Sequence, residues 1–129
     1  MKVGSFIVNV TSADPERLIA FYRDVVGLPP RDDMGPGAFK VLADIDELSF
    51  TIDGHSEITG ATKEPARVLF TLRVDDIAAE EARLDAAGVQ FIRRQGKEYW
   101  GGVISTFTDP DGNYMQIMQF VPEAAAVPA

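Results

Sequence analysis

The stretch from Phe6 to Gly27, FIVNVTSADPERLIAFYRDVVG, decides the fold. Its first part, up to Val10, is mostly β-branched or aromatic and predicts a strand. Asp14 is a good helix N-cap, and Pro15 fits the first helical position. The apolar residues that follow at helical spacing are Leu18, Phe21, Tyr22 and Val25. We therefore expect a helix directly after the strand, ending at Gly27.

After this helix, a turn-rich link over residues 29–37 leads to two expected strands, 38–43 and 48–53, joined by a turn over 44–47. The link has room for a third, weaker strand. A polar loop over residues 54–65 follows. A strand, a helix and then antiparallel strands form a sheet with the helix on one face. The opposite face is then where a functional site is expected.

The second half of the chain repeats this order. Residues 67–74 predict a strand, Asp75 and Asp76 offer a helix cap, and a helix is expected over residues 77–87, up to Gly88. The remaining expected strands are 89–94, 102–108 and 114–120, with a turn at 109–112. We interpret the chain as one domain over residues 1–122 built from two similar modules, about 3–54 and about 67–120, with a linker at about 55–66 and a flexible tail at 123–129.

The composition limits the possible chemistry. The 129 residues include no cysteine and one histidine, His55, which excludes disulfides, thiolate metal sites, a cysteine nucleophile and a two-histidine site within one chain. The net charge of −8 repels phosphate backbones and anionic lipids, so neither nucleic acid nor a membrane is an expected partner. No stretch approaches the ~20 apolar residues of a membrane helix. Cytoplasmic residence is the expectation.

Side chains alternate between the two faces of a strand, so each face can be listed from the sequence. The apolar sets, expected to form the core beneath the helices, are Phe6, Val8 and Val10; Leu48, Phe50 and Ile52; Val68, Phe70, Leu72 and Val74; Met115 and Ile117. The opposite face mixes apolar and polar groups: Ser5, Ile7, Asn9, Thr51, Leu69, Thr71, Arg73, Tyr114, Gln116 and Met118. A solvent-exposed sheet face would explain this set without any function. Apolar walls with a few polar groups fit a small-molecule pocket better.

Other candidate residues lie near this face. Trp100 precedes two glycines and is interpreted either as a pocket wall or as packing at the sheet edge. Arg73 either pairs with Asp53 or Glu98 or meets an anionic group of a ligand. His55 follows the last strand of the first half and is interpreted as a surface-loop residue rather than a ligand or base.

The two halves together resemble a known family. The residues that carry the resemblance are Val8-Asn9-Val10, Asp14 to Leu28, Val74 to Ile77, Ala86-Ala87-Gly88-Val89, Trp100-Gly101 and Phe107 to Asn113. In order and spacing they resemble the glyoxalase / bleomycin resistance protein / extradiol dioxygenase superfamily, or vicinal oxygen chelate (VOC) family, over about residues 3–120. The resemblance implies an α+β fold in which two βαβββ modules form a half-open β-barrel, commonly as a homodimer.

Many members of that family hold a divalent metal ion on the first and last strands of each module. The resemblance places these ligand positions on Ser5, Thr51, Leu69 and Gln116. A hydroxyl is a poor ligand and leucine is none, so only Gln116 keeps a plausible donor. We therefore expect no metal and no other cofactor.

Two functions remain open. The first is a metal-free, homodimeric protein that binds a small, partly aromatic or amphipathic molecule in the barrel or at a groove between subunits, as drug-sequestering members of the family do. The second is a metal-dependent lyase, isomerase or dioxygenase of the family, with a displaced or carboxylate-based site drawn from Asp53, His55, Glu57 and Glu98. Whether the protein is an enzyme is left open by the sequence.

Overall fold

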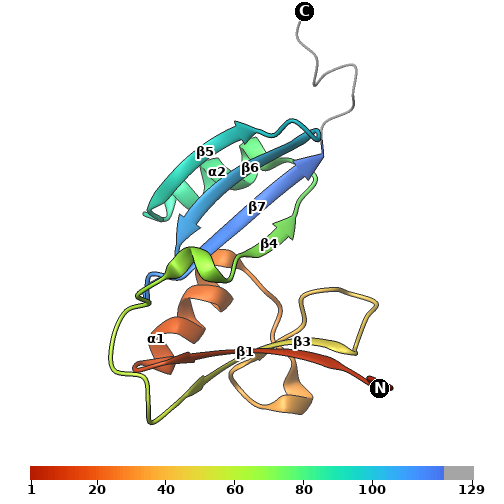
Figure 1. The fold of residues 1–129 in the computed structure, drawn as a ribbon, viewed down its shortest axis with the longest axis vertical. Helices are drawn as coiled ribbons and strands as arrows, with labels where there is room; N and C mark the ends of the chain where they lie inside the picture. The colour runs from red at the N-terminus through yellow and green to blue at the C-terminus, as the bar shows by residue number, and fades with distance from the viewer. Residues whose placement is uncertain (121–129) are drawn as a thin grey trace, which may run out of the picture. The chain divides into compact units, whose positions relative to one another are not determined.

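The computed structural model describes residues 1–120, with the backbone alone at Asp32. The predicted tail at 123–129 and the end of the predicted domain at 121–122 lie outside the described residues. The chain divides into two compact units, one over Met1–Ala61 and one that begins at Thr62 (Figure 1). Each unit consists of a β-sheet with a helix, so the chain has the α+β fold class that the sequence predicts. No helix among residues 1–120 has the length and apolar content to cross a membrane.

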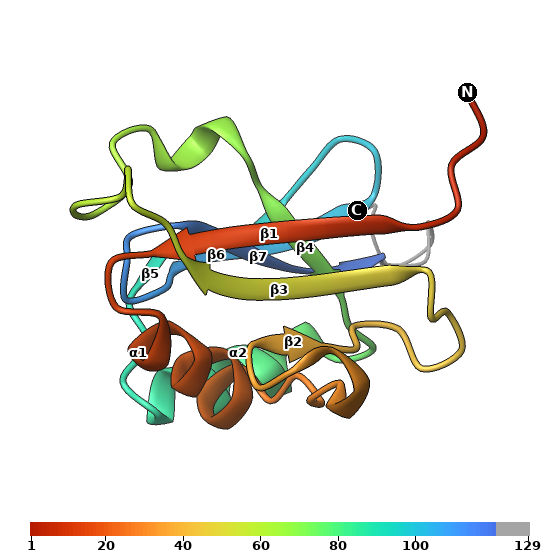
Figure 2. The same cartoon turned by 90° about the horizontal axis from the view of Figure 1, so that it is seen from below.

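The first unit is a three-stranded sheet with a helix on one face. Its elements are β1 (Phe6–Ser12), α1 (Pro15–Ala20), the π-helical turn η1 (Phe21–Val26), the 3-10 turn η2 (Asp32–Met34), β2 (Ala38–Phe39) and β3 (Leu48–Gly54). The strand order is β1-β3-β2, with β1 parallel and β2 antiparallel to β3. In Figure 2, α1 lies below β1 and β3, and both strands contact it.

The predicted first helix forms in two parts. The Asp14 carboxylate accepts a hydrogen bond from the backbone N–H of Arg17 at 3.3 Å, which caps α1 as predicted. The α-helix ends at Ala20, and a π-helical turn carries the chain on to Val26. The predicted single helix is therefore wrong in type beyond Ala20, because the N–H of Gly27 donates five residues back, to the carbonyl of Tyr22 at 3.0 Å. Gly27 ends the segment in the left-handed conformation, with φ at 88°.

Aromatic packing joins this segment to the sheet. Tyr22 is fully buried, and its ring meets that of Phe50 edge-on at 5.1 Å between centroids. Leu18 is buried beside it, whereas Phe6, predicted to belong to the core, is 64% exposed. Phe6 sits at the first position of β1, before the stretch where Val10 becomes buried. Alternation assigned Phe6 to the correct face but could not indicate how far the helix covers that face.

The strands predicted between the helix and β3 are much shorter than expected. Residues 38–43 supply only β2, and the third, weaker strand is reduced to one bridge between Pro30 and Phe39. Proline has no N–H, so Pro30 cannot extend the ladder. Arg31 instead fixes the link, because its guanidinium donates to the Asp46 carbonyl at 2.6 Å and to Ser49 Oγ at 2.8 Å.

The second unit has the complete βαβββ order. Its elements are the 3-10 turn η3 (Pro65–Arg67), β4 (Phe70–Arg73), α2 (Ile77–Ala86), β5 (Phe91–Lys97), β6 (Gly102–Thr108) and β7 (Tyr114–Phe120). The strand order is β4-β7-β6-β5, with β4 parallel to β7 and the other pairs antiparallel (Figure 1). The strand predicted over 67–74 is shorter, because Arg67 turns back to bind Glu64 at 2.8 Å. Val68, predicted to be buried, is 58% exposed.

The helix α2 contacts β5, β6 and β7, and the core of this unit lies between them. Asp76 caps the helix by accepting from the N–H of Ala79 at 3.0 Å, as predicted. Ser105, on β6, donates to the buried carboxylate of Glu81 at 2.5 Å. On the helix surface, a hydrogen bond from Arg94 holds the pKa of the Asp85 carboxyl below its usual value. These contacts identify the face of the sheet that carries Ser105 as the face covered by α2.

Gly37 supports the first unit through a close approach of two backbone segments. A Cβ atom at Gly37 would lie 2.3 Å from the carbonyl oxygen of Ile52. That oxygen cannot easily move away, because Ile52 belongs to β3. We expect Gly37→Ala to lower the free energy of unfolding by about 1–3 kcal/mol, as overpacking does. Urea unfolding measures this, with Gly60→Ala as the control, since nothing lies within 4 Å of a Cβ at Gly60. Equal effects of the two substitutions would contradict the packing shown here.

Candidate functional site

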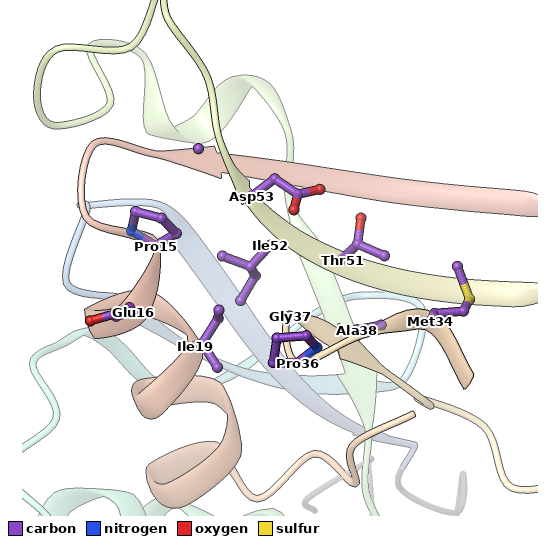
Figure 3. A pocket seen from close by; sticks show the side chains of 11 residues that line it. Pro15, Glu16, Ile19, Met34, Pro36, Gly37, Ala38, Thr51, Ile52 and Asp53 are labelled. Atoms are coloured by element: carbon purple, nitrogen blue, oxygen red, sulfur yellow. The ribbon is translucent and has the colours of Figure 1, made fainter. Parts of the chain in front are cut away.

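A pocket of about 260 Å³ opens in the first unit, between the start of α1, the link and the end of β3. In Figure 3 the side chains of Ile19, Pro36 and Ile52 gather toward one another, while Glu16 points away from them. Thr51 and Asp53 project from the other side of β3, as alternation along a strand requires (Figure 3). The side chains that gather in the pocket are thus apolar, and the hydroxyl of Thr51 and the carboxylates of Glu16 and Asp53 point away from them.

The predicted site residues of the first unit lie on the face of the sheet away from α1. Asn9 and Thr51 are partners in the ladder between β1 and β3, and the Thr51 hydroxyl donates to Asn9 Oδ1. Ile7, on the same face, is exposed, and Ser5 precedes β1 and is exposed. The structure therefore brings Asn9 and Thr51 together, and of the predicted residues in this unit only Thr51 lines the pocket.

Most of the pocket lining was not predicted as site residues: Pro15, Glu16, Ile19, Met34, Pro36, Gly37, Ala38, Ile52, Asp53 and Gly54. The sequence suggests Asp53 only as a partner of Arg73 or as part of a carboxylate-based metal site. The link that supplies Met34, Pro36 and Gly37 carries a turn signal but no chemical motif. A glycine between a proline and a strand was the one sign that two backbones approach closely there.

In the second unit, the predicted residues line the face of the sheet opposite α2. The register pairs Thr71 with Gln116 and Arg73 with Met118, so these side chains share a face, together with Leu69 before β4 and Tyr114 at the start of β7. Thr71 Oγ1 lies 2.9 Å from Gln116 Oε1, and Gln116 Nε2 lies 3.4 Å from Thr106 Oγ1. The Gln116 amide thus joins hydroxyls of both neighbouring strands. We call this face, with its polar centre at Gln116, the open face.

An aromatic pair lies at one end of the open face. The rings of Trp100 and Phe120 meet edge-on, with 5.8 Å between centroids, and are 43% and 50% exposed. The indole lies over Gly102, where a Cβ atom would come within 2.1 Å of it. Trp100 therefore packs against the sheet and still presents ring surface to solvent, and its role as a pocket wall stays a prediction. Phe120 was missed, although it continues the alternation of Tyr114, Gln116 and Met118 along β7.

Arg73 does not pair with Glu98, one of the two partners that the sequence suggested for it. Glu98 is bound by Arg93, with 2.6 Å between Nη1 and Oε1. The strand β5 is irregular between Arg93 and Gly96, and the Arg93 guanidinium lies over Gly96, where a side chain would clash. This bulge, which the sequence did not reveal, directs Arg93 toward Glu98. Arg73 instead lies over the ring of Phe120, with its guanidinium carbon 5.5 Å from the centroid.

The positions implied for a metal ion do not fit one. Leu69 offers no donor atom, and Ser5 and Thr51 offer neutral hydroxyls, of which that of Thr51 is bonded to Asn9. Gln116 is the one plausible metal ligand of the set, and a single neutral amide oxygen does not make a site for a divalent ion. This donor set contains no carboxylate or imidazole, the groups that bind divalent metal ions most often.

Three of the four residues of the alternative metal site, all but Asp53, have other partners. His55 Nδ1 accepts a hydrogen bond from the N–H of Glu57 at 3.1 Å and lies 3.9 Å from the Glu57 carboxylate. Glu98 belongs to the pair with Arg93. Within residues 1–120, no three His, Cys, Asp or Glu side chains are grouped so that they could hold a metal ion.

The sequence matches a known protein family, and the fold matches those of solved structures. A family model described as the Glyoxalase/Bleomycin resistance protein/Dioxygenase superfamily matches residues 6–117. No match is found among curated proteins.

Similar solved structures include TnmS3, an antibiotic binding protein from Streptomyces sp. CB03234, which is 26% identical, with 91% of this chain and 95% of that chain covered and a TM-score of 0.67. A glyoxalase/bleomycin resistance protein/dioxygenase family enzyme from Burkholderia phytofirmans PsJN is 20% identical, with 89% and 97% covered and a TM-score of 0.67. An integron cassette protein from V. cholerae is 19% identical, with 94% and 98% covered and a TM-score of 0.67. These likenesses confirm the predicted fold class.

Proposed function

The chain belongs to the Glyoxalase/Bleomycin resistance protein/Dioxygenase superfamily, and from that premise we propose that it binds a small, partly aromatic or amphipathic molecule without a metal ion. The observation that carries the proposal is the open face of the second unit. There a hydrogen-bonded amide at Gln116 is set among apolar and aromatic side chains. Small-molecule sites combine apolar walls with a few fixed polar groups in this way.

The donor set at the family's ligand positions supports the metal-free part of the proposal. Two hydroxyls, an amide and a leucine cannot replace imidazoles and carboxylates around a divalent ion. The likeness to an antibiotic binding protein at 26% identity supports the binding part, since that protein has the same fold over 91% of this chain. Cytoplasmic residence remains the prediction made from the sequence.

We also propose that the protein is a homodimer. The strand β1 lies at the edge of its sheet, and Val3, Phe6 and Ile7 on or beside it are between 46% and 66% exposed. An edge strand with exposed apolar side chains is a common place for association. Sedimentation equilibrium tests this, and a monomer at all concentrations would contradict it.

A thermal-shift screen of aromatic metabolites and antibiotics tests ligand binding. We expect at least one compound to raise the unfolding temperature saturably, because a ligand that binds only the folded state stabilises it. A screen in which no compound does so would overturn the proposal.

Elemental analysis of the same sample tests the alternative, a metal-dependent lyase, isomerase or dioxygenase using Asp53, His55, Glu57 or Glu98. Stoichiometric zinc, nickel, iron or manganese would favour that alternative.

Gln116→Leu tests whether the bound compound uses the open face. Loss of the amide removes a hydrogen bond worth about 0.5–1.5 kcal/mol, so the Kd of the compound should rise roughly two- to twelvefold. Calorimetric titration measures the change. The matched control is Gln90→Leu, which changes an exposed glutamine between α2 and β5 and should leave the Kd unchanged. An unchanged Kd in Gln116→Leu, with the variant folded, would place the binding site elsewhere.

A further inference from the structure

We infer that the ligand of the open face carries an anionic group, a carboxylate or a group of similar charge and shape, next to an aromatic ring, and that Arg73 binds that anion. This inference rests on the proposed function and specifies the chemical class of the ligand. It comes from the arrangement of Arg73, Phe120 and Trp100 at one end of the sheet.

Arg73 is an exposed cation that has no anionic partner among residues 62–120, the described part of its own unit. Within the described part of the second unit, no carboxylate lies within ion-pair distance of Arg73, and Glu98, one of the two partners suggested by the sequence, is bound by Arg93. Other exposed arginines of this unit are paired: Arg67 with Glu64, Arg83 with Glu80 and Arg94 with Asp85. In a chain with 20 acidic and 12 basic residues, an arginine without such a partner is unusual.

The contact with Phe120 orients Arg73 without satisfying it. A guanidinium has five N–H donors in its plane, and its attraction to a ring uses none of them as a conventional hydrogen bond. With the ring centroid 5.5 Å from its central carbon, the guanidinium is held at the surface of the aromatic pair. Its donors then remain available for the paired oxygens of a carboxylate, which match the geometry of a guanidinium.

The surroundings of Arg73 suit the rest of such a ligand. Trp100 and Phe120 are each about half exposed and offer ring surface next to the cation. Met118 is the partner of Arg73 in the ladder and leads along the same face to the Gln116 amide. If a planar aromatic molecule lies on these side chains, a carboxylate attached to the edge of its ring system would lie beside Arg73.

The net charge of −8 does not prevent this contact. At physiological ionic strength, charges more than about 8 Å away are largely screened, whereas a bidentate contact acts at hydrogen-bond distance. The overall charge should slow the approach of an anion and leave the local contact intact. Because Arg73 is exposed, added salt screens its attraction to the anion. We expect this screening to weaken binding of an anionic ligand and to leave that of its neutral analogue unchanged.

Naphthalene-2-carboxylate and naphthalene-2-carboxamide test the inference, since they share a ring system and differ in charge. The chain contains a single tryptophan, so one indole N–H signal in a proton–nitrogen NMR spectrum reports on Trp100 during titration. We expect the carboxylate to shift this signal saturably and to bind about tenfold more tightly than the amide, a difference of ~1.4 kcal/mol. Arg73→Met should abolish that preference, and Arg73→Lys should retain part of it. Arg83→Met, which removes an arginine from α2, should leave it unchanged.

Equal affinity for the two probes, or a preference that survives in Arg73→Met, would overturn the anionic ligand and leave small-molecule binding in place. Failure of both probes to shift the Trp100 signal, while neutral compounds from the thermal-shift screen bind, would overturn it in the same way. Failure of both probes together with an empty screen would overturn the proposed function as well.

Discussion

Phe107→Ala is expected to lower the free energy of unfolding by about 3–5 kcal/mol, the range measured for removing a fully buried phenylalanine. Phe107 lies on β6 with no exposed surface, and its ring meets that of Phe91 at 5.8 Å between centroids. The side chain lies on the face covered by α2, where a cavity cannot fill with solvent or collapse freely. Since domains are commonly stable by only about 5–15 kcal/mol, this loss should be evident in urea unfolding.

The control for this prediction is Phe6→Ala. Phe6 has the same side chain, but 64% of it is exposed, so little apolar surface is lost from the interior. We expect a change below about 1 kcal/mol at protein concentrations where the chain is monomeric. A loss for Phe6→Ala as large as that for Phe107→Ala would mean that Phe6 belongs to the core, as its sequence pattern predicts, and that the exposure described for it is wrong.

Gly102→Ala should disable the aromatic end of the open face while leaving the fold in place. A Cβ atom at Gly102 would lie 2.1 Å from the far edge of the Trp100 indole, so the ring must rotate away. Because a tryptophan in an interface commonly contributes about 2 kcal/mol or more, the Kd of a ligand on this face should rise roughly thirtyfold. The free energy of unfolding should change by less than about 1 kcal/mol, since a side chain moves and no backbone does.

Two measurements separate these effects. The emission of Trp100 should shift to longer wavelength in the free variant, because the displaced ring is more exposed to water. Calorimetric titration then gives the Kd, with Gly60→Ala as the control in which added bulk meets nothing. Unchanged ligand affinity in Gly102→Ala, together with a shifted emission, would show that Trp100 takes no part in binding.

The sequence predicted the fold well where local rules act alone. Caps at Asp14 and Asp76, the stop at Gly27 and the alternation along β7 all lie where expected, because each depends on one residue type and its near neighbours. The short β2 and the late start of β4, at Phe70, could not be predicted in the same way. They depend on Arg31 and Arg67, whose choice of partners is settled by contacts in three dimensions.

The candidate site shows the same division. Alternation placed Thr71, Arg73 and Gln116 on one face, and the register confirms that arrangement. It could not predict that a bulge in β5 directs Arg93 into an ion pair with Glu98. Arg73 then contacts the ring of Phe120 instead. Nor could it reveal the pocket beside Ile52, whose walls come from a link without a repeating pattern.

The most direct test of metal-free ligand binding is a calorimetric titration of the strongest compound from the thermal-shift screen, carried out with and without EDTA on protein whose metal content has been measured. We expect saturable binding with the same Kd in both conditions and a metal content well below one ion per chain. Binding that disappears with EDTA and returns with added zinc, nickel, iron or manganese would contradict it.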